Sequence, residues 1–164
     1  MPQDHSIQSA QGRTLVLGVG NILQGDDGLG VRLVEMLAKV DLPDYVVIEE
    51  AGTPGIDLIF RMEGYQRVIL IDAVQMGERP GAWRRFTPTE VKLIAKGEGL
   101  SLHETGIAGA LELAQALNQL PDEIVLYGIE PQNVTWSEEL SPPVQEALPE
   151  VLEKILSELW KREA

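Results

Sequence analysis

Acidic side chains follow the first apolar segment of the chain. The run Thr14–Val19 is apolar almost throughout, as expected for a strand that is buried on both faces. It leads into several glycines and the adjacent carboxylates Asp26 and Asp27. Glycine lets the backbone turn sharply and lets another group approach closely. We therefore expect a tight loop that places acid groups at the edge of a sheet, where sites in open α/β sheets are built.

Two further side chains are expected at the same edge. Asp72 ends a second apolar run, and His103 precedes the segment with the clearest helical spacing. The carboxyl ends of parallel strands share one edge of a sheet, and a loop that enters a helix can also lie there. Two carboxylates and an imidazole can ligate nickel or zinc, or they can position and deprotonate a water molecule. Spacing alone is weak support for a metal, because the chain has no H-x-x-x-H or H-E-x-x-H pattern.

Each of these residues also has a structural interpretation. Asp26 and Asp27 can cap the following helix at its positive end, and Asp72 can cap a turn. The chain has two histidines, His5 and His103. A single loop histidine is more often structural or solvated than catalytic. The importance of His103 therefore depends on the carboxylates expected near it.

A nucleotide-binding loop is a second alternative for the glycine-rich segment. The spacing of Gly18, Gly20, Gly25 and Gly28 does not match G-x-G-x-x-G, and no G-x-x-x-x-G-K-[ST] motif occurs. Two carboxylates facing a phosphate would also repel it. The sequence therefore argues against dinucleotide binding.

Composition narrows the class of protein. The 164 residues suit one domain with a substantial core, and 26 acids against 13 bases give a formal charge of −13. Such an excess of acid disfavours nucleic acid, whose binding depends on Lys and Arg. The chain has no cysteine, so a disulfide, a thiolate nucleophile and a thiolate metal site are excluded.

The ends of the chain and its hydropathy give further expectations. Residues 1–13 are predicted to be a flexible tail without the features of a secretory signal, and residues 14–164 a single domain. No apolar run approaches the roughly 18 residues needed to span a bilayer. We expect a cytoplasmic monomer that contacts neither membrane nor nucleic acid.

The order of elements predicts an α/β fold. Strands alternate with helices, which implies a three-layer structure with a mainly parallel, twisted sheet of about five strands and helices on both faces. Residues 82–86 should form an edge strand, and the weakly patterned residues 92–99 a surface segment. Ser141 should cap the last helix, which Pro149 should kink. The predicted strands are 14–19, 45–50, 67–74, 82–86 and 123–129, and the predicted helices are 30–40, 56–62, 104–117 and the one that starts at 141.

The motifs, taken together, resemble those of a known family, the maturation endopeptidases of [NiFe] hydrogenases. The resemblance begins with LVLGVGNILQGDDGLGV at residues 15–31 and covers nearly the whole chain from Thr14 onward, in the family's order. The other matching segments are GTPG (52–55), IDA (71–73) with Gly77 and PG (80–81), SLHxTG (101–106), YGIEP (127–131) and LSP (140–142). Glu104, at the variable position of SLHxTG, departs from the family, where Gln or an apolar residue is more usual.

The resemblance implies a peptidase that removes a C-terminal extension from the hydrogenase large-subunit precursor after nickel insertion. By position in the family motifs, Asp27, Asp72 and His103 would be the residues that contact nickel and carry the aspartic-type chemistry. The nickel would belong to the substrate's metal centre and would not be held permanently by this protein. An alternative with the same ligands is a non-catalytic, chaperone-like module that recognises the nickel centre without cutting its partner.

Overall fold

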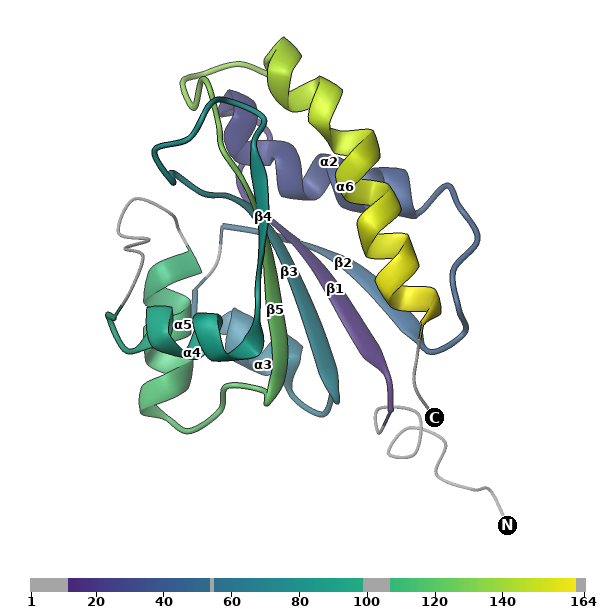
Figure 1. Ribbon diagram of the computed structural model, residues 1–164. Helices are drawn as coiled ribbons and strands as arrows, with labels where there is room; N and C mark the ends of the chain where they lie inside the picture. Colours follow the sequence, from purple (N-terminus) through teal and green to yellow (C-terminus); the bar gives the residue numbers. More distant parts are fainter. Residues whose placement is uncertain (1–11, 54, 99–106, 162–164) are drawn as a thin grey trace.

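A single sheet forms the centre of the computed structural model (Figure 1). Within residues 12–53, 55–98 and 107–161, which the structure describes, five strands pair in the order β2-β1-β3-β5-β4. β1, β2, β3 and β5 are parallel, and the edge strand β4 runs antiparallel to β5. The strands are β1 (Thr14–Val19), β2 (Val46–Gly52), β3 (Arg67–Ala73), β4 (Trp83–Phe86) and β5 (Glu123–Ile129).

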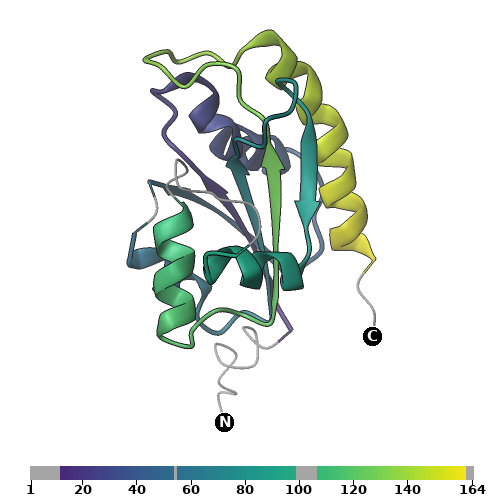
Figure 2. The same cartoon turned by 60° about the vertical axis from the view of Figure 1, so that its left-hand side comes forward.

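Helices cover both faces of the sheet. Figure 1 shows the helices α2 (Leu29–Leu37) and α6 (Pro142–Trp160) on one face. The other face carries α3 (Asp57–Met62), α4 (Pro88–Ala95) and α5 (Ile107–Ala116). The view in Figure 2 separates these layers. The predicted three-layer α/β architecture is therefore confirmed.

Successive side chains of the central strands point to opposite faces of the sheet, so the core is divided between the two faces. In β1, Leu15 and Leu17 belong to the core under α3, α4 and α5, whereas Val16 belongs to the core under α2 and α6. All three side chains are fully buried. A strand with both faces covered needs apolar side chains on each of them, which explains the continuous apolar run in the sequence.

The order in which strands are added to the sheet reverses at β1. The chain leaves β1 for β2 on one side and then returns to β3 on the other, so β1 pairs with both. At such a switch point the connections diverge and leave a crevice at the carboxyl ends of the strands. Gly18 of β1 pairs with Ile71 of β3, which places Asp72 beside the last residue of β1.

Residues 92–95 of the expected surface segment 92–99 belong to a helix that the sequence pattern does not predict. Helix α4 occupies Pro88–Ala95, and its residues Val91 and Ile94 are buried. The helix begins with a capping box, in which Thr87 and Glu90 each accept a hydrogen bond from the other's backbone amide. Thr87, Pro88 and Glu90 form a start signal in the sequence that the weak apolar spacing after it obscures.

The start of α6 also differs from expectation. Ser141 occupies the N-cap position, but its side chain makes no hydrogen bond to the helix. The hydroxyl instead donates to Asp26 Oδ2 at 2.7 Å. The helix continues through Pro149 to Trp160. In the part of the chain that the structure describes, no helix combines the length and apolar character needed to cross a membrane.

Candidate active site

The loop after β1 folds back on itself around a carboxylate. The Asn21 amide donates to Asp27 Oδ2 at 2.8 Å, and the Leu23 amide donates to Asn21 Oδ1 at 2.9 Å. Asp27 lies in a short 3-10 helix, η1 (Gly25–Gly28), directly before α2. These contacts fix the partly buried Asp27 side chain at the carboxyl end of β1.

Glycine is required where this loop and α2 meet the strands. Gly20 has φ of +127°, and a Cβ atom there would lie 1.7 Å from the Asp27 carbonyl oxygen. A Cβ on Gly30 would lie 2.2 Å from the Ile71 carbonyl oxygen and 2.6 Å from that of Val19. The close approach predicted from the glycines is therefore present, and it brings the start of α2 onto the ends of β1 and β3.

Asp72 is a buried carboxylate at the end of β3. Its Oδ1 accepts a hydrogen bond from the Ala73 amide at 2.8 Å, whereas its buried Oδ2 has no hydrogen-bond partner among the described residues. Burial raises the pKa of Asp72 well above its usual value, and the nearby charge of Asp27 raises it further. The Ala73 amide opposes this shift by lowering the pKa. The two carboxylates are thus close enough to interact electrostatically.

Asp26, next to Asp27 in the sequence, has a different environment. Its side chain is 0% exposed and accepts hydrogen bonds from the Gln132, Asn133 and Ser141 amides and the Ser141 hydroxyl. Helix α2 has Gly28 at its N-cap and no side-chain cap. The capping interpretation is therefore wrong for Asp26, which instead holds the segment between β5 and α6 against the loop after β1.

The third candidate, His103, lies outside the described residues. The structure therefore brings Asp27 and Asp72 together and does not test their proximity to the histidine. Among residues 12–53, 55–98 and 107–161, no group of three His, Cys, Asp or Glu side chains is arranged to hold a metal ion. The expected three-residue constellation stays a prediction.

The comparisons with known proteins identify the family. The family model described as "Hydrogenase maturation protease" matches residues 31–158, most of the chain. The chain belongs to this family. The resemblance noted in the sequence is confirmed, and the protein is a hydrogenase maturation endopeptidase.

Individual relatives of this maturation protease agree in sequence and structure. It is 37% identical over 142 residues to the hydrogenase expression/formation protein HupD of Bradyrhizobium diazoefficiens, covering 85% of this chain and 74% of that protein. The hydrogenase maturating endopeptidase HybD from E. coli superposes with a TM-score of 0.78 at 34% identity, covering 91% and 93%. The [NiFe] hydrogenase maturation protease HybD from Thermococcus kodakarensis gives 0.71 at 29% identity, covering 90% and 99%.

Sequence reasoning missed the role of Glu130 in this maturation protease. The side chain is buried, and its Oε1 accepts hydrogen bonds from the Met76 and Glu78 amides at 2.7 and 2.9 Å. Glu130 therefore fixes the segment that leaves β3 just after Asp72. The position of this carboxylate, between an apolar strand and Pro131, is the signal that could have found it.

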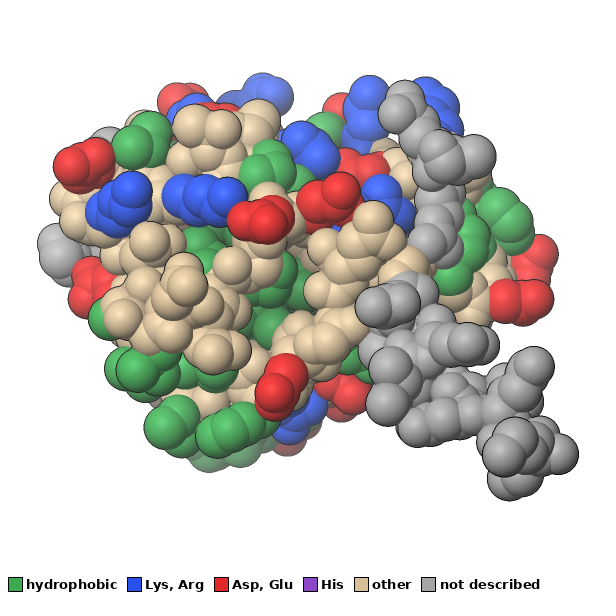
Figure 3. Space-filling view, turned by 90° about the horizontal axis from the view of Figure 1, so that it is seen from below, with side chains coloured by type: hydrophobic (Ala, Val, Ile, Leu, Met, Phe, Trp, Pro, Cys, Tyr) green, Lys and Arg blue, Asp and Glu red, His purple; other side chains and the backbone are tan. Residues whose placement is uncertain are grey.

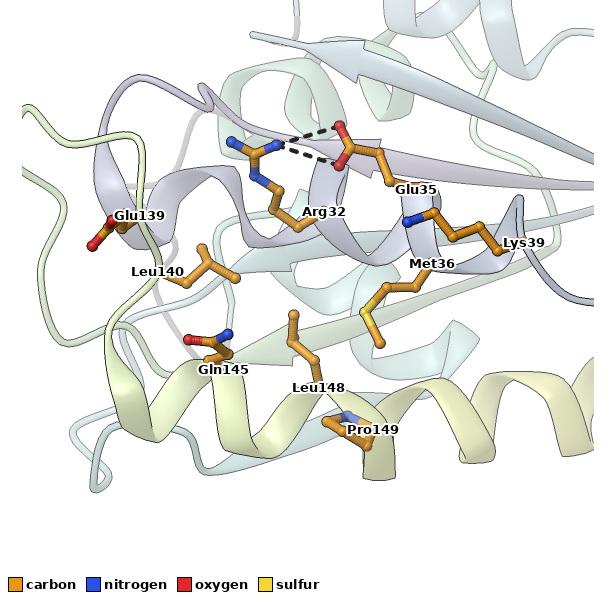
Figure 4. A pocket seen from close by; sticks show the side chains of 9 residues that line it. All are labelled: Arg32, Glu35, Met36, Lys39, Glu139, Leu140, Gln145, Leu148 and Pro149. Atoms are coloured by element: carbon orange, nitrogen blue, oxygen red, sulfur yellow. Dashed lines mark hydrogen bonds and ion pairs between the residues drawn. The ribbon is translucent and has the colours of Figure 1, made fainter.

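Helix α2 of the maturation protease borders several surface hollows. A cleft of about 450 Å³ lies beside the Asp27 loop and is lined by Gly20, Asn21, Ile22 and the end of β2. A groove of about 690 Å³ lies between α2 and α6, with Met36 and Leu148 pointing into it and Arg32 paired with Glu35 at its edge (Figure 4). Neither Asp27 nor Asp72 lines the groove or the cleft. Asn21, whose amide donates to Asp27, lines the cleft, so we assign the cleft to the candidate active site.

Proposed function

We propose that Asp27, Asp72 and His103 are the groups with which this endopeptidase processes the C-terminus of a hydrogenase large-subunit precursor. In this proposal the three side chains recognise nickel in the precursor and so report that its metal centre is complete. The observation that carries the proposal is the buried Asp72, whose Oδ2 lacks a partner among the described residues and whose pKa is raised beside Asp27.

A buried pair of carboxylates suits a divalent cation. Without a cation, burial and the charge of Asp27 favour the protonated form of Asp72. A nickel ion between the two groups would favour the ionised form, because its charge reverses the local electrostatics. Engagement of the nickel centre is thus expected to release a proton. His103 would supply the imidazole that nickel accepts readily.

Peptide hydrolysis catalysed by this protein would proceed by direct attack of water on the substrate. The chain contains no cysteine that could serve as a nucleophile. Three protein ligands leave positions on nickel for the substrate's own groups or for water. Either the metal or a protonated carboxyl group polarises the scissile carbonyl, while a second, ionised carboxylate takes a proton from the water.

The remaining features of the proposal concern the setting of the reaction. The nickel belongs to the precursor, so the isolated protein carries no permanent metal. The excess of acidic side chains suits a protein partner better than nucleic acid. We further propose that the protein acts as a monomer in the cytoplasm.

The first test is a mass spectrum of nickel-loaded precursor after incubation with the protein, beside precursor prepared without nickel. The expected result is loss of a C-terminal peptide from the nickel-loaded sample alone. Equal cleavage of both samples would show that cleavage does not require nickel in the precursor. Binding without any loss of mass would contradict the proposed activity on this substrate.

The second test removes one carboxylate charge. Asp27→Asn is expected to reduce the cleavage rate by roughly a hundredfold or more, because the proton acceptor or metal ligand is lost, while the melting temperature stays near that of the wild type. His103→Ala should lose cleavage as well. The matched control is His5→Ala, which changes the other histidine of the chain and should cleave at the wild-type rate. Unchanged processing by Asp27→Asn would rule out its assignment.

A further inference from the structure

Two segments that are distant in the sequence pair beside the candidate active site. The Ser137 amide donates to the Leu23 carbonyl at 2.9 Å, and the Gly25 amide donates to the Ser137 carbonyl at 2.8 Å. The Asp26 amide donates to the Asn133 carbonyl at 2.8 Å. The segment after β5 therefore lies along the loop that leads to Asp27.

The buried Asp26 carboxylate locks this pairing. It accepts hydrogen bonds from three backbone amides and one hydroxyl of residues 132–141. Hydrogen bonds to a charged group are stronger than those between neutral groups, so this arrangement is held firmly. Because Asp27 is the next residue, the segment after β5 has a fixed position relative to the candidate active site. The proposed chemistry makes no other use of Asp26.

Both segments expose large apolar side chains. Trp136 is 78% exposed, Val134 is 41% exposed and Ile22 is 38% exposed. Ile22 also lines the cleft beside the Asp27 loop. We call these three residues the apolar rim. A rigid backbone that holds apolar side chains in water is typical of a surface that binds a partner.

We propose that the apolar rim binds an apolar segment of the precursor and so positions its scissile bond at Asp27. This inference rests on the proposed function. The occupant is the precursor because the rim is continuous with the candidate active site: Ile22 directly follows Asn21, whose amide binds Asp27. The exposed carboxylates of Glu138 and Glu139 follow Trp136 closely, so the bound segment should carry basic residues beside its apolar ones.

The opposite end of the molecule provides a matched control. Trp160 ends α6 and is 54% exposed. Its neighbour Leu159 accepts a hydrogen bond from the Tyr45 hydroxyl, and the Tyr45 carbonyl accepts one from the amide of Thr14, the first residue of β1. Trp160 therefore lies near the amino ends of the strands, away from the carboxyl ends that carry Asp27 and Asp72.

The test measures cleavage of nickel-loaded precursor by Trp136→Ala, Trp136→Phe and Trp160→Ala. For Trp136→Ala we expect KM to rise about tenfold or more with kcat nearly unchanged, because the truncated side chain contributes to binding and takes no part in the proposed chemistry. Trp136→Phe should recover part of the loss, and Trp160→Ala should match the wild type. The melting temperature of each variant checks that its fold is intact.

A second measurement separates this inference from the proposed function. The Kd for the same precursor is determined by calorimetry for the wild type and Trp136→Ala. A wild type that leaves the precursor mass unchanged contradicts the proposed function, and the Kd comparison then tests the rim by itself. Equal Kd and equal KM for the wild type and Trp136→Ala would overturn the role of the rim. A loss of affinity that Trp160→Ala reproduces would overturn it as well.

Discussion

Adjacent carboxylates in this protein have different environments because their hydrogen-bond partners differ. Asp26 accepts hydrogen bonds from residues 132–141 and has a structural role. Asp27 accepts one from Asn21 and lies next to the cleft. Asp72 is buried with one oxygen atom unpaired among the described residues. An unpaired buried carboxylate destabilises a fold, and such groups persist where a ligand or reaction uses them.

The buried Asp72 predicts a pH-dependent cost to stability. Its pKa is higher in the folded than in the unfolded protein, so the folded state retains a proton that the unfolded state loses above about pH 3.9. Stability should therefore fall as pH rises from that value to the folded-state pKa. Asp72→Asn removes the cost of keeping this carboxyl group buried above about pH 3.9, so the free energy of unfolding of the variant should exceed that of the wild type at pH 7.

Denaturant unfolding of the nickel-free protein between pH 3 and pH 8 measures this effect. The advantage of Asp72→Asn should vanish near the acid end of the range, where Asp72 is protonated in both states of the wild type. The same variant should lose cleavage. An Asp72→Asn protein that is less stable than the wild type at pH 7 would show that the carboxylate is paired in solution.

At the scale of elements, local signals explain most starts and ends of the helices and strands. The apolar runs correctly place β1, β3 and β5, with bounds that differ from expectation by at most one residue. Helix α4 is not predicted by apolar periodicity because its apolar positions are few, and its capping box is the one local signal of its start. Only packing against the sheet buries Val91 and Ile94, and a local pattern does not contain that contact.

The capping box of α4 should contribute measurably to stability. Thr87→Ala removes the oxygen that accepts a hydrogen bond from the Glu90 amide, and this should lower the free energy of unfolding by about 1 kcal/mol. Thr89→Ala, an exposed substitution within the same helix, should change it by less than about 0.5 kcal/mol. Equal effects of the two variants in urea unfolding would mean that the box is not formed in solution.

Across the whole molecule, the architecture concentrates chemistry at one end of the sheet. Figure 2 shows the carboxyl ends of the parallel strands together at one end, with β4 running the other way. The face seen from below in Figure 3 carries Lys, Arg, Asp and Glu side chains interspersed. That face therefore has no single sign of charge, although the formal charge of the chain is −13.

Contact between the layers depends on the absence of a side chain at Gly30. Gly30→Ala would place a Cβ atom 2.2 Å from the Ile71 carbonyl oxygen, so α2 would have to move away from the ends of β1 and β3. We expect a loss of roughly 3 kcal/mol in the free energy of unfolding, together with reduced cleavage.

A second helical glycine supplies the control for this prediction. Gly109 in α5 is exposed, and a Cβ atom there would meet nothing within 4 Å. Gly109→Ala should therefore raise the free energy of unfolding by roughly 0.5–1 kcal/mol, since alanine favours the helix. Denaturant unfolding of both variants tests the pair. A neutral Gly30→Ala would show that the layers are not in close contact.

The sequence alone determined the order of elements, the layered α/β class and the family. Strands buried on both faces require continuous apolar runs, and tight loops require glycine. Both features can therefore be recognised from neighbouring residues in the sequence, such as Leu15, Leu17 and Gly20. Tertiary structure decided the environment of each acid. Asp26 and Asp27 are neighbours with the same side chain, but Asp26 binds the distant Ser141 whereas Asp27 binds the nearby Asn21. The contact of Asp26, with a residue more than a hundred positions away, depends on chain topology, which local residue patterns do not encode.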